Sequence, residues 1–180
     1  MYICILRGIN VAGKKKIKMA DLIELFQMLG HKNVSTYIQS GNVFFEPKSQ
    51  KPRNILKDEI EKAILKTYSF HVEVDIRTHE ELERILLNFP FDEAKSEDNY
   101  TKLLVTFLQS APSKENKEIL LKYVQTPDKL LIIDKEVYLY CPNGYGKSKL
   151  NNTFIEKKLA LFATTRNYKS VKKLYELSKN

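Results

Sequence analysis

The sequence predicts an α+β protein made of two tandem ferredoxin-like (split βαβ) subdomains, each with an extra helix and with mainly antiparallel sheets. Three observations lead to this fold class. The expected order, strand–helix–strand–strand–helix–strand and then a helix, occurs twice along the 180 residues. Apolar residues make up 43% of the chain, which is enough for a packed interior. A polar stretch separates the repeats, so we expect subdomains at 1–90 and 100–180 joined by a linker at 91–99.

The first half alternates between the two sequence periods that distinguish strands from helices. Short apolar runs rich in β-branched and aromatic residues predict strands, whereas apolar residues three or four positions apart predict helices. The pattern predicts strands at 2–7, at two runs within 34–46 and at 70–76. It predicts helices at 19–30, 54–68 and 78–89.

Local signals mark the ends of these elements. Gly30 is expected to end the first helix, and the turn at 40–42 is expected to join the second and third strands. Asn54 is the expected N-cap of the second helix. Thr78 and Glu81 have the spacing of a capping box, so the third helix is expected to start there.

The second half repeats this order without a residue-level repeat. Strands are expected at 100–108, 129–134, 136–141 and 163–166. Helices are expected at 113–124, 148–162 and 167–178, the last one capped by Asn167. The repeated order, rather than any shared residues, is what indicates two similar subdomains.

The split βαβ topology predicts which loops lie together. The first and second strands run parallel with the third between them, so the loop after the first strand and the hairpin after the second share one end of the sheet. In the first half these are "RGINVAGKKK" at 7–16 and "QSGN" at 39–42. The opposite end of the second half gathers "CPNGYGKSK" at 141–149 and "TTRNYK" at 164–169.

Positive charge is concentrated near the two ends of the chain. The net charge is +8, and residues 1–20 carry five Lys or Arg with no acid. Residues 142–180 carry nine Lys or Arg against two Glu, whereas 21–141 carry sixteen against twenty acids. This asymmetry indicates an anionic partner if folding joins the two basic segments in one electropositive hollow, and only solubility if it does not.

Several classes of protein are disfavoured by the sequence. No apolar run approaches the roughly 18 residues that span a bilayer, and the N-terminus has the pattern of a first strand rather than of a signal peptide. Cys4 and Cys141 lie in strand-like runs and are expected to be reduced and buried, so we expect a cytoplasmic protein. No metal-ligand or cofactor motif is present, and we predict neither a metal nor a cofactor.

Six motifs resemble a known bacterial family. They are "LRGINVAGKKKIKM", "TYIQSGNVFF", "NFPF", "YTKLLVTFL", "GYGKSKL" and "TTRNYKSVKKL". In this order they resemble the family called domain of unknown function 1697. The chain has Ala12-Gly13 where that family usually has two glycines, and Thr165-Arg166-Asn167-Tyr168 where it often has "ARNW". The resemblance implies a soluble α+β fold and supplies no activity.

The loop after the first strand is a candidate anion site. Glycines let backbone N–H groups approach an anion, lysines add point charges, and an arginine can hold a phosphate or carboxylate with two hydrogen bonds. The candidate residues here are Arg7, Gly8, Asn10, Gly13 and Lys14. The alternative is a solvated basic turn whose glycines serve backbone geometry alone.

A second candidate is "GYGKSKL", which precedes an expected helix. It looks like part of the phosphate-binding loop G-x-x-x-x-G-K-[ST], but Cys141 stands where the first glycine is required, so nucleotide hydrolysis of that class is not expected. Gly146, Lys147, Lys149 and a capping Ser148 can still hold an anion at a helix N-terminus. The alternative is a glycine-rich turn and an ordinary cap.

Two further segments supply candidate polar contacts. Gln39, Ser40 and Asn42 have side chains that read base edges or ribose hydroxyls, although turn formation alone explains them. Arg166, Asn167 and Tyr168 offer a cation beside an aromatic ring, which suits a stacked base and its phosphate. Capping of the last helix is sufficient to explain Asn167.

These observations support three hypotheses about function. The first is binding of a phosphate-bearing polyanion such as RNA through the basic Gly/Lys loops. The second is an enzyme that acts on a small phosphorylated or carboxylated metabolite in the cleft between the subdomains. The third is a structural protein without a ligand. Possible partners are therefore RNA or a phosphorylated small molecule, with no membrane, and the residues leave open whether any reaction is catalysed.

Overall fold

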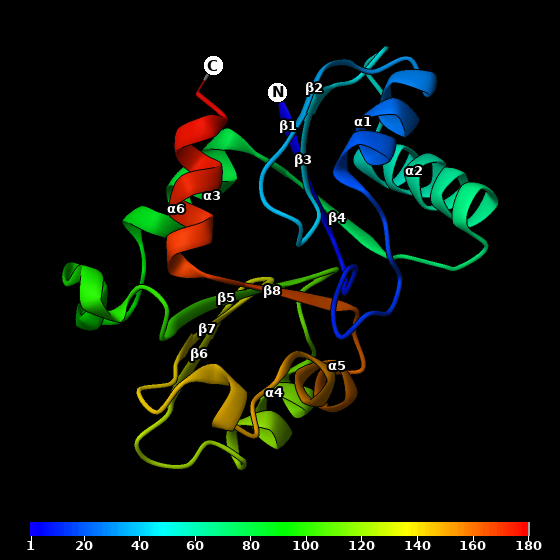
Figure 1. Cartoon of the computed structure of the whole chain (residues 1–180). Coiled ribbons are helices and arrows are strands. Elements are labelled where there is room, and N and C mark those ends of the chain that lie inside the picture. Colours follow the sequence, from blue (N-terminus) through cyan, green and yellow to red (C-terminus); the bar gives the residue numbers. More distant parts are fainter. Residues whose placement is uncertain (180) are drawn as a thin grey trace. The chain divides into compact units, whose positions relative to one another are not determined.

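The computed structural model, which describes residues 1–179, has two four-stranded antiparallel sheets, each packed with helices (Figure 1). This confirms the predicted α+β class with two ferredoxin-like subdomains. The chain divides into two compact units, Met1–Glu83 with the segment from Leu174 onward, and Arg84–Lys173. The predicted boundaries at 90 and 100 stay a prediction.

The sheet of the first unit has the strand order β2-β3-β1-β4, and every neighbouring pair is antiparallel. Its strands are β1 (Tyr2–Leu6), β2 (Lys32–Thr36), β3 (Asn42–Glu46) and β4 (Val74–Thr78). The helices of this half of the chain are α1 (Met19–Met28), α2 (Arg53–Tyr68) and α3 (His79–Leu87). The order is that of a split βαβ unit, in which β1 lies between its two partners.

The central strand β1 is buried on both faces. Cys4 and Leu6 belong to the core cluster that also includes Phe26 of α1 and Ile60 of α2. Ile3 and Ile5 point to the opposite face, because successive side chains alternate along a strand, and they too are fully buried. This explains why "YICIL" is a continuous apolar run rather than an alternating one.

The sheet of the second unit has the order β6-β7-β5-β8, again antiparallel throughout. Its strands are β5 (Leu103–Leu108), β6 (Lys129–Ile133), β7 (Glu136–Tyr140) and β8 (Ala163–Asn167). The α-helices of this half are α4 (Lys114–Leu121), α5 (Asn152–Leu159) and α6 (Tyr168–Leu177). Short 3-10 turns occur at Asp92–Lys95, Glu97–Asn99 and Tyr145–Lys147.

Several predicted ends are wrong. Helix α2 begins at Arg53 after Pro52, so Asn54 is inside the helix and is not its N-cap. The strand predicted at 70–76 is β4, which starts only at Val74, because its partner β1 ends at Leu6 opposite that residue. The hairpin loop after β2 is longer than predicted, and Asn42 is already the first residue of β3.

The predicted caps at Thr78 and Asn167 are confirmed. The backbone N–H of Thr78 donates to the Glu81 carboxylate at 2.9 Å, and that of Glu81 donates to Thr78 Oγ1 at 3.3 Å, which is the reciprocal pattern of a capping box. Asn167 Oδ1 accepts the Ser170 N–H at 2.8 Å and caps α6. Cys4 and Cys141 are buried free thiols. Among the described residues, no helix combines the length and apolar character needed to span a membrane.

His31 is buried beside two aromatic rings of the first unit. Its ring centroid lies 4.7 Å from that of Phe45 and 5.8 Å from that of Phe26. Nδ1 accepts the Lys48 backbone N–H at 3.4 Å, whereas Nε2 has no hydrogen-bond partner within residues 1–179. Burial lowers the pKa of His31 below its ordinary value of 6.5, so the folded protein favours the neutral ring.

We predict that this ring makes the protein acid-labile. Below a pH of about 6.5 the unfolded chain takes up a proton at His31 that the folded protein resists, so the free energy of unfolding falls as the pH falls. Urea denaturation across this range measures the effect, and His31→Leu is expected to flatten it. His71→Leu is the matched control, because the His71 side chain is 53% exposed. Equal pH dependence in wild type and His31→Leu contradicts the prediction.

Candidate functional site

In the first unit, the loop after β1 packs against the hairpin between β2 and β3, as the topology predicts. We call residues 7–18 the basic loop. The Leu6 N–H donates to the Gly41 carbonyl at 2.8 Å. A Cβ added at Gly41 would lie 2.7 Å from Leu6 Cβ and 2.8 Å from Ile9 Cδ1, so only glycine permits this approach. The basic loop and the hairpin therefore form one packed end of the sheet.

Asn10 holds the basic loop in place. Its Nδ2 donates to the carbonyls of Ile17 and Gln39, both at 2.9 Å, and its Oδ1 accepts the Ile17 N–H at 2.9 Å. Its φ of 56° is left-handed, a conformation that asparagine tolerates better than most residues. Asn10 is thus committed to internal hydrogen bonds, and it fixes the loop rather than offering a free amide to a ligand.

The lysines of the basic loop fall into two groups. Lys15 Nζ donates to the His71 carbonyl at 2.7 Å and ties the loop to the segment before β4. Lys14, Lys16 and Lys18 are exposed, and their ammonium groups have no partner among the described residues. The fold therefore orders the loop without using three of its four lysines.

The remaining candidates of the first unit differ in exposure. Arg7 is half-buried, and its backbone N–H donates to the Glu73 carbonyl at 2.9 Å. Gly8 and Gly13 have left-handed φ values of 63° and 75°. The Gln39 side chain is exposed at the hairpin.

Two polar residues of the hairpin serve the turn itself. Asn42 is fully buried, and its Nδ2 donates to the Tyr37 carbonyl at 3.0 Å and to Ser40 Oγ at 3.1 Å. These bonds satisfy the polar groups inside the turn, which is the structural alternative given above for Ser40 and Asn42.

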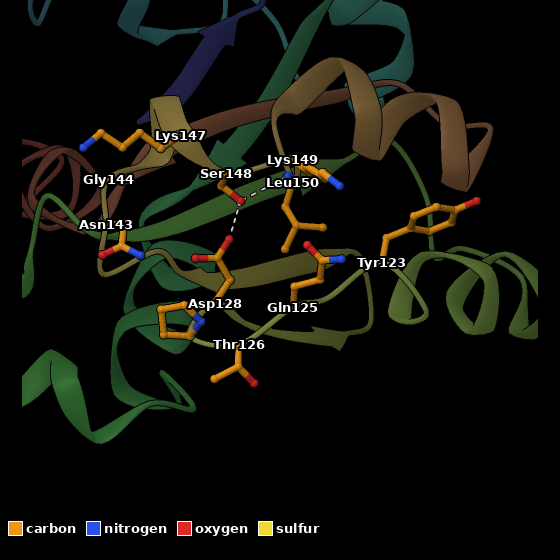
Figure 2. Close-up of a pocket in the computed structure, with 11 residues that line it drawn as sticks. Tyr123, Gln125, Thr126, Asp128, Asn143, Gly144, Lys147, Ser148, Lys149 and Leu150 are labelled. Atoms are coloured by element: carbon orange, nitrogen blue, oxygen red, sulfur yellow. Dashed lines mark hydrogen bonds between the residues drawn. The ribbon is translucent and has the colours of Figure 1, made fainter.

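In the second unit, the loop after β7 borders a pocket with a volume of about 440 Å³ (Figure 2). The other wall is the segment before β6. We call this cavity the pocket, and its lining residues are Tyr123, Gln125, Thr126, Pro127, Asp128, Asn143, Gly144, Lys147, Ser148, Lys149 and Leu150. Three of the four residues predicted in "GYGKSKL" thus line one cavity, whereas Gly146 lies in the adjoining 3-10 turn.

Ser148 joins the two walls of the pocket. Its Oγ donates to Asp128 Oδ2 at 2.5 Å and accepts the Leu150 N–H at 3.1 Å. It is not the cap predicted from the sequence, because α5 begins at Asn152 and Asn151 Oδ1 accepts the Phe154 N–H at 3.0 Å. The predicted helix over 148–162 is correspondingly shorter.

Cys141 lies next to this pair, and its burial disfavours the thiolate form. Burial raises the pKa of the Cys141 thiol to about 11, a hydrogen bond with Ser148 opposes that rise, and the Asp128 charge adds to it. The group is therefore protonated at neutral pH, and a thiol attacks poorly compared with a thiolate.

A polar network connects the loop after β7 to β8. Tyr145 Oη donates to Thr165 Oγ1 at 3.4 Å. The Thr165 hydroxyl in turn donates to Asn152 Oδ1 at 2.7 Å. Thr165 Oγ1 also lies 2.8 Å from Thr106 Oγ1 in the sheet. The two motifs predicted to share this end of the second sheet do share it.

The candidates at the end of β8 point into the protein. Arg166 is 9% exposed, and its Nη1 donates to the Thr165 carbonyl at 2.9 Å and to Thr164 Oγ1 at 3.2 Å. Tyr168 is also 9% exposed, with ring centroids of Phe89 and Tyr100 both 4.8 Å away. A base stacked on Tyr168 would have to displace one of these rings.

Sequence reasoning missed one wall of the pocket. Gln125, Thr126 and Asp128 are not among the candidate residues predicted from the sequence. The topology contains the missing signal, since the segment before the second strand and the loop after the third occupy the same end of a split βαβ sheet. The meeting of the basic segments of the two units in one shared hollow remains a prediction.

Comparisons place the chain in a family. A family model described as "Protein of unknown function (DUF1697)" matches residues 1–138. The chain belongs to this family. The DUF1697 match covers four of the six motifs noted above and ends before "GYGKSKL" and "TTRNYKSVKKL". A search of curated proteins finds no match.

One solved structure, a conserved bacterial protein SP0830 from Streptococcus pneumoniae, is similar to this DUF1697 chain. The two are 23% identical, and the alignment covers 99% of this chain and 98% of the other with a TM-score of 0.77. Identity at this level supports a common fold and carries no activity.

We predict that Gly41 matters more for stability than Gly13. Both have left-handed φ values, 78° and 75°, so alanine costs about 1 kcal/mol of backbone strain at either site. Only at Gly41 does the new Cβ also collide with Leu6 and Ile9, which adds roughly 1–3 kcal/mol. Urea denaturation of Gly41→Ala and Gly13→Ala measures the difference, and equal losses of stability contradict the close approach.

Proposed function

We propose that the protein binds the phosphate backbone of RNA, and that the basic loop of the first unit is the contact surface. The observation that carries this proposal is the set of three exposed lysines without internal partners, Lys14, Lys16 and Lys18, on a loop that Asn10 and Lys15 hold in place. Ordered cations lose less conformational freedom on binding than cations on a mobile segment.

The charge pattern favours a polyanion over a protein surface. Residues 1–20 contain no acid, so the basic loop carries positive charge only. Lysine ammonium groups act as point charges on phosphates and read no sequence, which suits contacts with the backbone. We therefore expect binding that depends strongly on salt and weakly on RNA sequence.

An enzyme acting on a small phosphorylated or carboxylated metabolite is the second candidate. The pocket favours it, because lysines, a carboxylate and amides converge on a cavity of ligand size. The location differs from the original hypothesis, since this pocket is lined only by residues of the second unit. A cleft between the subdomains remains a prediction.

We predict that the basic loop sets the salt dependence of RNA binding. Three lysines on single-stranded RNA contribute a slope of about −2 in a plot of log K against log salt, or roughly 20-fold in affinity between about 50 and 200 mM salt. Fluorescence anisotropy with a labelled single-stranded RNA measures both quantities. The variant Lys14→Ala/Lys16→Ala/Lys18→Ala is expected to lose that slope together with at least about tenfold in affinity at the lower salt concentration.

The matched control removes the same charge from a helix of the second unit. Lys114, Lys117 and Lys122 lie in or directly after α4, and Lys114→Ala/Lys117→Ala/Lys122→Ala changes the net charge equally. Equal losses in the two triple variants would mean that net charge alone drives binding and would refute the site. No RNA binding by the wild-type protein at low salt would favour the third hypothesis, a protein without a ligand.

A further inference from the structure

The pocket of the second unit is built from a hydrogen-bonded loop and a short connecting segment. The loop is closed by backbone hydrogen bonds from Gly144 to Cys141, at 2.9 Å, and from Lys147 to Gly144, at 3.0 Å. The facing segment turns at Gln125, whose carbonyl accepts the Asp128 N–H at 2.9 Å. A volume of about 440 Å³ suits a small metabolite, because ligand pockets usually span about 300–1,000 Å³.

A partly used carboxylate lies at the centre of this pocket. Figure 2 shows Asp128 between Asn143 on one side and Gln125 on the other, with Ser148 above it. Asp128 Oδ2 accepts the Ser148 hydroxyl, whereas no described residue donates to Oδ1. A carboxylate has about four lone-pair sites, so Asp128 can accept further hydrogen bonds from a ligand.

The groups beside the carboxylate both donate and accept. The side chains of Gln125, Thr126 and Asn143 make no hydrogen bond to another described residue. Amide and hydroxyl groups suit ligand hydroxyls, which themselves donate and accept, better than an ammonium group, which can only donate. Several hydroxyls next to one another are therefore the best partners for this part of the pocket.

Two free cations border the same cavity. Lys147 and Lys149 extend to opposite sides of Ser148 in Figure 2. Both are exposed, and their ammonium groups have no partner among the described residues. A ligand that fills the pocket therefore meets acceptors at the centre and positive charge at the edge.

We propose that the pocket binds a small polyol that carries one anionic group, such as a sugar phosphate or a sugar acid. The polyol hydroxyls donate to Asp128 and exchange hydrogen bonds with Gln125 and Asn143. The anionic group lies at Lys147 or Lys149, and the apolar side chains of Pro127 and Leu150 border the carbon skeleton. This site does not depend on RNA binding by the basic loop.

The central carboxylate argues against two other occupants. A long polyanion would bring several phosphates towards Asp128, and like charges in a confined cavity repel. A metal ion needs more than one strong ligand, and no group of three His, Cys, Asp or Glu suited to a metal occurs within residues 1–179. A ligand with a single anionic group can place that group near Lys147 or Lys149 and away from Asp128, so it is attracted by the lysines without strong repulsion from the carboxylate.

Calorimetric titration of the full chain tests the ligand class. The probes are glucose-6-phosphate, glucuronate, glucose and inorganic phosphate, which separate the polyol from the anion and the phosphate from the carboxylate. Glucose-6-phosphate or glucuronate is expected to bind at least about tenfold more tightly than glucose and inorganic phosphate, because only they use both parts of the pocket. If neither exceeds glucose and inorganic phosphate, the proposal is overturned.

Variants of the pocket locate the binding. Asp128→Asn keeps an oxygen that accepts from Ser148. It is expected to weaken glucose-6-phosphate or glucuronate about tenfold and not to weaken inorganic phosphate, which loses a like charge nearby. Asn143→Ala alters an exposed side chain and provides a second test that does not depend on the Ser148 contact, with an expected loss of about threefold. Unchanged affinity in both variants overturns the proposal.

Lysine variants separate this site from the basic loop. Lys147→Ala/Lys149→Ala is expected to abolish the preference for glucose-6-phosphate or glucuronate over glucose. Lys62→Ala/Lys66→Ala in α2 removes the same charge and is expected to leave that preference intact. Lys14→Ala/Lys16→Ala/Lys18→Ala should also leave it intact, whatever its effect on RNA. Loss of the preference in either of these two controls overturns the assignment to the pocket.

Discussion

β1 and β5 each lie between two antiparallel neighbours, and this placement determines which loops share an end of each sheet. In the first unit, β1 ends where β3 begins, since Ile5 pairs with Asn42, and the basic loop therefore starts beside the hairpin. In the second unit, β5 begins opposite the ends of both β7 and β8. The basic loop depends on the pairing of β1 with β3, which sets the loop against the hairpin. The pocket depends on the pairing of β6 with β7, in which Lys129 lies opposite Tyr140, because its two walls precede β6 and follow β7.

Some polar residues at these sheet ends make hydrogen bonds within the protein, and others have side chains that remain available to a ligand. Asn10, Asn42 and Arg166 satisfy backbone or hydroxyl groups that folding removes from water, and a buried polar group without such a partner is costly. Lys14 and Lys147 have no internal partner, so their charge remains available to a ligand. Residue type alone does not separate the two groups, because Lys15, next to Lys14, donates to the His71 carbonyl.

The topology, the pairs of neighbouring loops and the Thr78 cap could be predicted because they follow from periodicity and short-range spacing. Other features could not. Asn54 has the right chemistry for an N-cap, but the N-cap is Pro52, two residues earlier. The role of Asp128 depends on a contact with Ser148, twenty residues later, and no local pattern announces it. Burial of Tyr168 depends on Phe89 and Tyr100, which lie just before and just after the segment predicted as a linker.

The two candidate sites use lysine in different surroundings, and this difference separates the ligands they suit. The basic loop is an exposed surface without acids, so it can follow an extended chain of phosphates but offers no walls to a small molecule. The pocket encloses a small volume around Asp128, so it can surround a compact ligand but repels a chain of phosphates. Charge alone would assign one polyanion to both segments. Asp128 lines the same pocket as Lys147 and Lys149, and its negative charge disfavours a polyanion there. The two sites are therefore better explained by two different ligands than by one polyanion bound to both.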